Sequence, residues 1–115
     1  MPGRNKYGNR ITMVDGIKFR SAKEAKRYGE LKALEKTGDI NALELQPRFP
    51  LHAPGGTLVG HYVADFRYVA IEQTAGGGGS IVVSVVEDVK GCKTPLYRWK
   101  KKQVEAEYGI KIIEV

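Results

Sequence analysis

The sequence predicts a mixed α/β fold in which a mixed β-sheet is flanked by two helices and preceded by a β-hairpin. Three segments in the middle of the chain are β-prone, and two segments with capping residues repeat apolar residues at helical spacing. The second helical segment also stands between two strand-like segments. A strand, a crossover helix and another strand form a βαβ unit, so the last strand should run parallel to the third core strand.

Short local signals define the first two elements. Asp15 and Gly16 separate two β-prone runs within residues 10–20, and this dipeptide accommodates the positive φ angles of a two-residue hairpin turn. Ser21 can cap a helix, with Glu24 three residues later as in a capping box and a glycine at the end of the helical pattern. We therefore expect a hairpin followed directly by a helix.

Three strands are expected next. The first, residues 40–51, is interrupted by Pro47 and Pro50, which indicates an edge position or a bend. The second, residues 58–71, is long enough to cross a whole sheet. The third, residues 81–91, is so rich in valine that we expect burial on both faces.

A second helix and a short strand complete the fold. Thr94 is the expected N-cap, Pro95 suits the first helical position, and a glycine ends the helix before the final strand, residues 110–115. Trp99 and Tyr108 on this helix are expected to pack in the core rather than to stack on bases.

Length and composition limit the class of protein. A chain of 115 residues supports one hydrophobic core, so we expect a single domain over residues 1–115, with a basic arm at 1–9 and a flexible glycine-rich loop at 72–80. No apolar segment approaches the roughly 20 residues that cross a bilayer, and the N-terminus lacks the apolar part of a signal peptide. We expect a cytoplasmic protein with no membrane partner. One cysteine, Cys92, and two histidines exclude an intrachain disulfide and a four-ligand structural zinc site.

The net charge of +6 is unevenly distributed along the chain. Residues 1–36 carry +6, residues 37–90 carry −3 and residues 91–115 carry +3. Basic flanks suit a polyanion such as DNA, although an ordinary basic surface explains the charge alone equally well. The acidic middle needs another explanation, because a phosphate-binding surface avoids acids.

A group of ionisable residues in the expected sheet supplies that explanation. Asp88 and Lys90 are separated by one residue on the expected third strand, so their side chains should point to the same face of the sheet, about 7 Å apart. If the second strand is the antiparallel neighbour, Asp65 can lie about 5 Å from Asp88. Two such carboxylates repel unless a cation lies between them, and hard oxygen ligands favour Mg²⁺ or Mn²⁺. Glu24 could reach the same edge, although the capping box explains it without a metal.

Metal-assisted hydrolysis of a phosphodiester requires these parts together. Carboxylates hold the metal, and a lysine orients the attacking water or offsets developing charge. The alternative is a solvated strand face with an ordinary ion pair. Gln46 could line the same cleft. The expected contacts with DNA phosphates are the basic residues Lys6, Arg10, Lys93, Lys100 and Lys101, although lysines on a helix are also typical of a solvated face.

The order α-β-β-β-α-β, with Asp65 on the second strand and D-V-K at residues 88–90, resembles the PD-(D/E)xK nuclease superfamily. Ala64 stands where the motif has proline. More narrowly, a family of small phage and prophage proteins of unknown function placed in that superfamily is similar to this chain from Asn5 to Val115. The similar blocks are N-K-Y, V-D-G-I-K-F-x-S-x-x-E-A-K-R-Y, L-E-L-Q-P-R-F, Y-x-A-D-F and V-E-D-V-K-G.

This resemblance implies a restriction endonuclease-like fold and a Mg²⁺-dependent DNA endonuclease. It implies that Asp65, Asp88, Lys90 and Glu24 are catalytic, and that the backbone carbonyl of Val89 joins the three carboxylates as a metal ligand. Holliday-junction resolvases of the superfamily cut branched DNA, so a structure-specific activity is one option. The rival function is a non-catalytic nucleic-acid-binding module of a phage replication or packaging complex. One protomer carries one site, so cutting both strands calls for a homodimer or two encounters.

Overall fold

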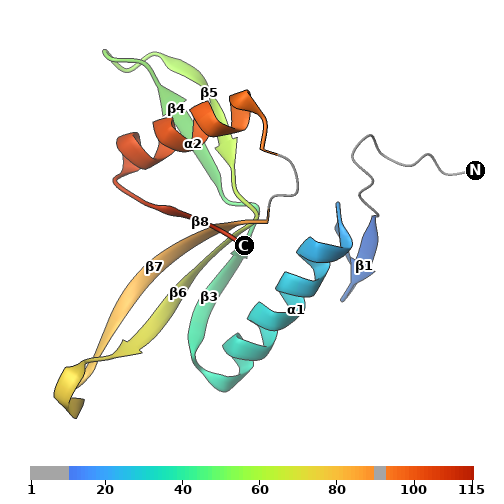
Figure 1. The fold of residues 1–115 in the computed structure, drawn as a ribbon, viewed down its shortest axis with the longest axis vertical. Coiled ribbons are helices and arrows are strands. Elements are labelled where there is room, and N and C mark those ends of the chain that lie inside the picture. The colour runs from blue at the N-terminus through green and yellow to red at the C-terminus, as the bar shows by residue number, and fades with distance from the viewer. Residues whose placement is uncertain (1–10, 90–92) are drawn as a thin grey trace, which may run out of the picture.

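The computed structural model describes residues 11–89 and 93–115, and it confirms a mixed α/β fold with two helices (Figure 1). The elements in chain order are β1 (Thr12–Val14), β2 (Ile17–Phe19), α1 (Ala22–Thr37), β3 (Ile40–Leu45), β4 (Arg48–His52), β5 (Leu58–Val63), β6 (Phe66–Gln73), the 3₁₀ turn η1 (Ala75–Gly77), β7 (Ser80–Asp88), α2 (Pro95–Tyr108) and β8 (Ile112–Glu114).

The N-terminal hairpin and α1 form as their local signals predict. Strands β1 and β2 pair antiparallel, and Asp15 and Gly16 between them both have positive φ, 51° and 74°. The Ser21 hydroxyl accepts a hydrogen bond of 3.1 Å from the Glu24 N–H, and Gly38 ends α1 in the left-handed conformation with φ of 85°. The cap and the stop therefore fix the limits of α1.

The central sheet has the strand order β3-β6-β7-β8. Strand β6 is antiparallel to both β3 and β7, whereas β8 runs parallel to β7. Helix α2 connects these last two strands and begins at Thr94, whose hydroxyl accepts from the Tyr97 N–H at 3.1 Å. The structure thereby confirms the expected βαβ unit.

Each of the first two expected core strands is divided into two. Segment 40–51 forms β3 and β4, and segment 58–71 contains β5 and the start of β6. Leu45 pairs with Phe66 before the break, and Arg48 pairs with Val63 after it, which is three residues later in the first segment and three residues earlier in the second. The register is therefore unchanged, and the two segments are one long antiparallel pair that bends.

The bend has a local cause. Gln46 has a left-handed φ of 50°, and Pro47 has no N–H to continue the ladder. Two backbone hydrogen bonds still hold the bend together, from the Gln46 N–H to the Asp65 carbonyl at 2.9 Å and from the Ala64 N–H to the Pro47 carbonyl at 3.1 Å. The predicted bend in the first segment is confirmed, and the prediction of one uninterrupted second strand is wrong.

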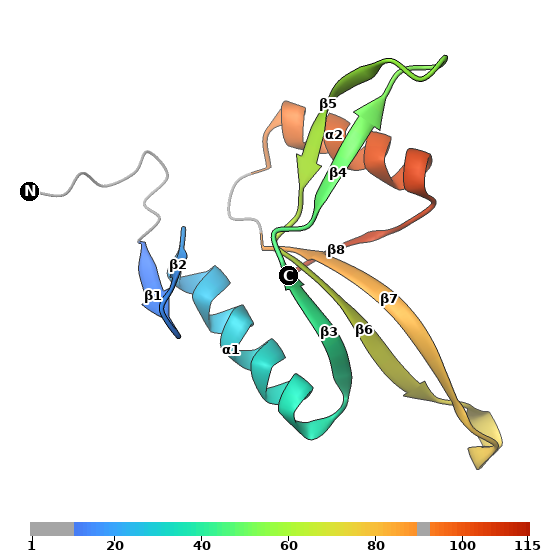
Figure 2. The ribbon, with the colours of Figure 1, turned by 180° about the vertical axis from the view of Figure 1, so that it is seen from behind.

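The buried residues form two hydrophobic cores, and the helices that cover them, α1 and α2, lie on either side of this bend (Figure 2). The first core joins α1 to β2, β3 and β6 through Phe19, Ala25, Tyr28, Leu31, Ile40, Phe66 and Tyr68. The second core joins α2 to β4, β5, β7 and β8 through Phe49, Leu51, Tyr62, Ala64, Val86, Val104 and Ile112. One helix therefore covers each core, and the expectation of a single hydrophobic core is wrong, because the bend divides the long pair of strands between two clusters.

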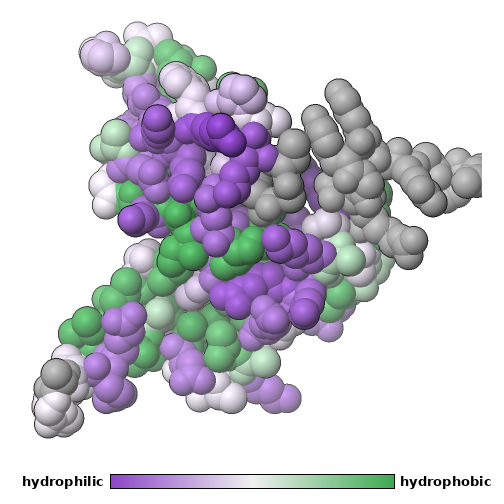
Figure 3. Space-filling view, viewed as in Figure 1, coloured by the Kyte–Doolittle hydropathy of each residue, from purple (hydrophilic) through white to green (hydrophobic). Residues whose placement is uncertain are grey.

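The distal half of the β6–β7 hairpin is largely exposed and apolar (Figure 3). Val82 is 69% exposed, and Ile71 and Ile81 are also exposed. The expected burial of this strand on both faces is wrong for its first half, because β8 pairs only with the last three residues of β7. The expected loop is also shorter than residues 72–80, since β6 continues to Gln73 and β7 begins at Ser80.

Helix α2 buries only a narrow stripe. Val104 is fully buried, but Trp99 is 52% exposed and Tyr108 is 40% exposed. The prediction that both aromatic residues lie in the core is wrong, because α2 packs only against the short β4–β5 hairpin and the sheet end. Among the described residues, neither helix has the length and apolar character needed to cross a membrane.

Candidate functional site

Asp65 lies at the bend between β5 and β6, beside the end of β7. Its N–H donates to the Glu87 carbonyl at 3.1 Å, and its Oδ2 accepts from the Val89 N–H at 2.7 Å. Asp88 lies between these two partners on β7. The structure therefore brings Asp65 and Asp88 to neighbouring positions, although Asp65 is outside a regular strand rather than near the middle of one.

Consecutive residues at the end of β7 point to opposite faces of the sheet. Asp88 is fully buried, and its Oδ2 accepts a hydrogen bond from the Tyr62 hydroxyl, on the side of the second core. Glu87 points the other way, toward α1 and Tyr68. Two acidic residues that are adjacent in the sequence thus have separate environments.

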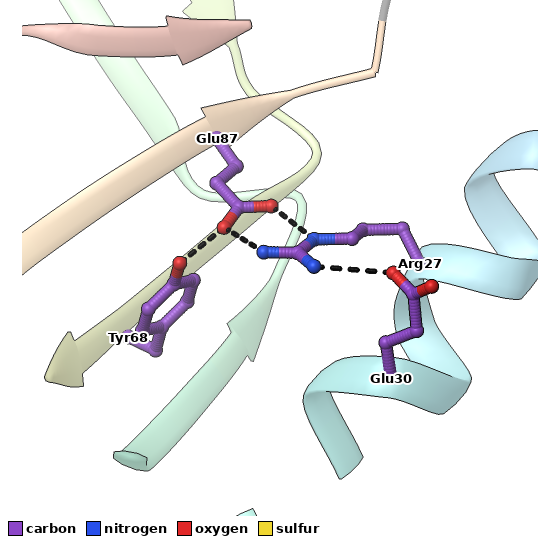
Figure 4. Close-up of polar contacts among 4 residues, drawn as sticks. All are labelled: Arg27, Glu30, Tyr68 and Glu87. Carbon is purple, nitrogen blue, oxygen red and sulfur yellow. Dashed lines mark hydrogen bonds and ion pairs between the residues drawn. The ribbon is translucent and has the colours of Figure 1, made fainter. Parts of the chain in front are cut away.

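The Glu87 carboxylate is held by a polar network on the α1 side (Figure 4). Arg27 donates to both carboxylate oxygens, from Nε at 2.8 Å and from Nη2 at 2.7 Å, and the Tyr68 hydroxyl donates to Oε2. Arg27 also binds Glu30 at 3.1 Å. The hydrogen bonds to Glu87 raise the pKa of Arg27, and burial together with Glu87 raises the pKa of Tyr68 to about 12. This network attaches α1 to the end of β7.

Glu24 occupies the first turn of α1 and is only 5% exposed. Its helix packs against the sheet face on which Glu87 lies, whereas Asp88 lies on the opposite face. Within residues 11–89 and 93–115, no group of three or more histidine, cysteine, aspartate or glutamate side chains is arranged to hold a metal ion. The expected convergence of Glu24 with Asp65 and Asp88 is therefore not seen in this part of the chain.

The two aspartates alone fit the donor set of a small hard cation. Mg²⁺ is typically held by one or two carboxylates and keeps water molecules and substrate phosphates as its other ligands. Asp65, at the bend before β6, and Asp88, at the end of β7, supply two carboxylates from neighbouring positions. Val89 follows Asp88 directly, and Lys90 lies outside the described residues. The number and type of ligands therefore suit Mg²⁺ or Mn²⁺.

The lysines expected to contact DNA are placed less favourably. Lys93 and Lys101 both approach Oε1 of Glu114, at 3.2 Å and 3.7 Å. The hydroxyl of Tyr97 donates to the other oxygen of Glu114 at 2.7 Å, and this hydrogen bond and Lys93 lower the pKa of Glu114. The two lysines are thus partly neutralised. Lys100 is half-buried, and the expected contacts Lys6 and Arg10 lie outside the described residues.

A cavity of about 300 Å³ opens beside Asp65, and its lining includes basic residues that the sequence patterns did not identify. The lining residues are Arg20, Gln46, Arg48, Val63 and Asp65. Gln46, which the sequence offered only as one residue that could line the cleft, lines this cavity. The sequence patterns gave neither Arg20 nor Arg48 a role in the site, and α1 and β3 separate the two residues along the chain, so only the folded chain brings them together. Two signals for Arg48 were available, its place in the block L-E-L-Q-P-R-F and its position directly after the proline that marks the bend.

The fold and this site define a mixed α/β protein in which Asp65, next to the buried Asp88, shares a cavity with two exposed arginines where a long pair of strands bends away from the sheet. The chain belongs to the family described as "Protein of unknown function (DUF1064)", whose model matches residues 4–113. This match confirms the resemblance to a family of unknown function. No curated protein and no solved structure matches the chain.

Proposed function

We propose that this protein is a Mg²⁺-dependent DNA endonuclease of the PD-(D/E)xK superfamily. The observation that carries the proposal is the position of Asp65 against residues 87–89, which makes it the neighbour of Asp88 at the end of β7. Lys90 follows two residues later in the sequence, so the D-x-K spacing adds a cation to the two carboxylates.

Each residue has a distinct role in this proposal. Asp65 and Asp88 hold the metal, which when bound supplies a polarised phosphate oxygen and a more acidic water. Lys90 orients that water toward phosphorus, and its ammonium group offsets the negative charge that grows on the phosphate. Hydrolysis adds water across one P–O bond and leaves a phosphate end and a hydroxyl end. The Val89 N–H holds the Asp65 carboxylate in place through its 2.7 Å hydrogen bond.

One observation favours the alternative, a nucleic-acid-binding module without catalysis. Asp88 is fully buried and accepts a hydrogen bond from Tyr62, and such an aspartate can be purely structural. In that case the arginine-lined cavity would bind nucleic acid, while Asp65 and Asp88 would only stabilise the bend.

A nicking assay on supercoiled plasmid and on a four-way DNA junction separates the two functions. The parent protein should cut at least one substrate with Mg²⁺ or Mn²⁺ but not with EDTA. Asp88→Asn and Asp65→Asn should each lower the rate by a factor of about 100 or more, equivalent to about 2.7 kcal/mol of transition-state stabilisation. Asp39→Asn, an exposed control at the far end of α1, should cut like the parent. DNA binding without metal-dependent cutting would support the binding module instead, and full activity of Asp88→Asn would overturn the proposed role of Asp88 in holding the metal.

A further inference from the structure

The cavity beside Asp65 contains two arginines from separate parts of the fold. Arg20 lies between the end of β2 and the N-cap of α1, and Arg48 is the first residue of β4. Both side chains are exposed, and both line the cavity of about 300 Å³ with Asp65 and Gln46. We propose that Arg20 and Arg48 form a binding site for a backbone phosphate of DNA.

The first argument is that these two charges have no acidic partner within the described residues. Two other arginines are neutralised, since Arg27 binds Glu87 at 2.7 Å and Arg67 binds Glu44 at 2.5 Å. No ion pair joins Arg20 or Arg48 to any residue among 11–89 and 93–115. Two unneutralised guanidinium groups beside one cavity attract an anion from solution.

The second argument concerns the kind of anion. A guanidinium group presents N–H donors in a planar fork that matches two phosphate oxygens, and the exposed Gln46 adds an amide. Asp65 lies in the same cavity and disfavours a small free anion there. A phosphate that belongs to a chain is less affected, because its other contacts anchor it along the protein surface. The site therefore suits a phosphodiester rather than inorganic phosphate.

The third argument is that the backbone pre-forms the site. Gln46 has φ of 50°, a conformation that costs a non-glycine residue free energy and often occurs at functional sites. Its N–H binds the Asp65 carbonyl at 2.9 Å, and the Ala64 N–H binds the Pro47 carbonyl at 3.1 Å. The bend that places Asp65 therefore also places Arg48, whatever occupies the cavity.

The choice of DNA as the polyanion rests on the proposed function, but the test requires no catalysis. Binding of a fluorescein-labelled 20-base-pair DNA duplex is measured by fluorescence anisotropy in EDTA over a range of salt concentrations. Arg20→Ala and Arg48→Ala should each weaken binding about tenfold, as expected for the loss of a charged hydrogen bond. Each should also lower the magnitude of the slope of log K against log salt by about 0.9, the value for one phosphate contact.

Two further variants sharpen the measurement. Arg67→Ala removes an arginine that is neutralised by Glu44, so it should bind DNA within a factor of about two of the parent. Arg48→Lys keeps the charge but not the planar fork, so it should restore the salt slope and only part of the affinity. Thermal melting shows whether Arg48→Ala is folded. If it is not folded, the comparison of Arg48→Lys with the parent serves as the test.

The outcomes separate this inference from the endonuclease proposal. If Arg20→Ala and Arg48→Ala bind with the affinity and salt slope of the parent, or if the parent binds no DNA, the phosphate site is wrong. If the parent never cuts DNA but the arginine variants lose binding, the phosphate site holds and the endonuclease proposal fails. If Asp88→Asn abolishes cutting while the arginine variants bind normally, the reverse is true.

Discussion

The Arg27–Glu87 pair allows a quantitative test of how α1 is attached to the sheet. In Arg27→Met, the Glu87 carboxylate keeps the Tyr68 hydroxyl but loses both guanidinium hydrogen bonds. Glu87 is only 1% exposed, and removing one partner of a buried ion pair typically costs 3–5 kcal/mol. Because the Arg27 side chain is 26% exposed, water can enter the vacated space. We therefore expect the low end, a loss of about 3 kcal/mol in the free energy of unfolding.

Urea denaturation followed by circular dichroism measures this loss. Arg67→Met is the matched control, since its partner Glu44 is 49% exposed and such surface pairs contribute at most about 1 kcal/mol. The double variant Arg27→Met with Glu87→Gln should be more stable than Arg27→Met alone, because the unpaired buried charge is gone. An Arg27→Met variant no less stable than Arg67→Met would show that the pair is not needed. If the double variant is less stable than Arg27→Met, the loss in the free energy of unfolding comes from packing and not from the unpaired charge.

Four further predictions concern protonation, chemistry and charge. The pKa of Tyr68 is raised to about 12. Its stabilisation of the folded state should therefore be complete below the ordinary tyrosine pKa of about 10 and vanish as the pH rises to about 12. Urea denaturation of the parent and of Tyr68→Phe at several pH values measures this contribution. The hydrogen bond to His52 lowers the pKa of Glu107, so its stabilisation should be present above the ordinary glutamate value of about 4.3 and lost below it. Glu107→Gln should flatten that part of the curve of melting temperature against pH. Lys90→Ala should bind DNA normally but cut about 100-fold more slowly in single-turnover assays. Deletion of residues 1–9 should lower the slope of log K against log salt for DNA binding and leave the metal site unaffected.

Elements set by neighbouring residues were predictable from the sequence. The hairpin turn at Asp15 and the helix starts at Ser21 and Thr94 need only short-range hydrogen bonds and backbone preferences. The division of each long strand into two was not predictable, because it depends on which strands pair with each other in the folded chain. There, β6 pairs with β7 as far as Phe66, and beyond that point β5 leaves with β4.

The candidate site was predictable to a similar extent. The closeness of Asp65 to Asp88 follows from antiparallel neighbours with motif residues at corresponding positions. The ion pair that partly neutralises Lys93 could not be predicted in this way, because it forms only after β8 brings Glu114 to the start of α2. The pairing of Arg20 with Arg48 in one cavity is also invisible in the sequence, since it depends on where the strands bend.

The unchanged register across the bend has a consequence for folding. Tyr62 lies in the second core and Phe66 in the first, yet both belong to the same long pair of strands. A slip of one residue would turn the side chains of both segments to the opposite faces, so a mispaired chain would lose both cores at once. The packing of each core therefore favours the strand register that the other core also needs. We expect the two cores to unfold together, in one cooperative transition measured by calorimetry.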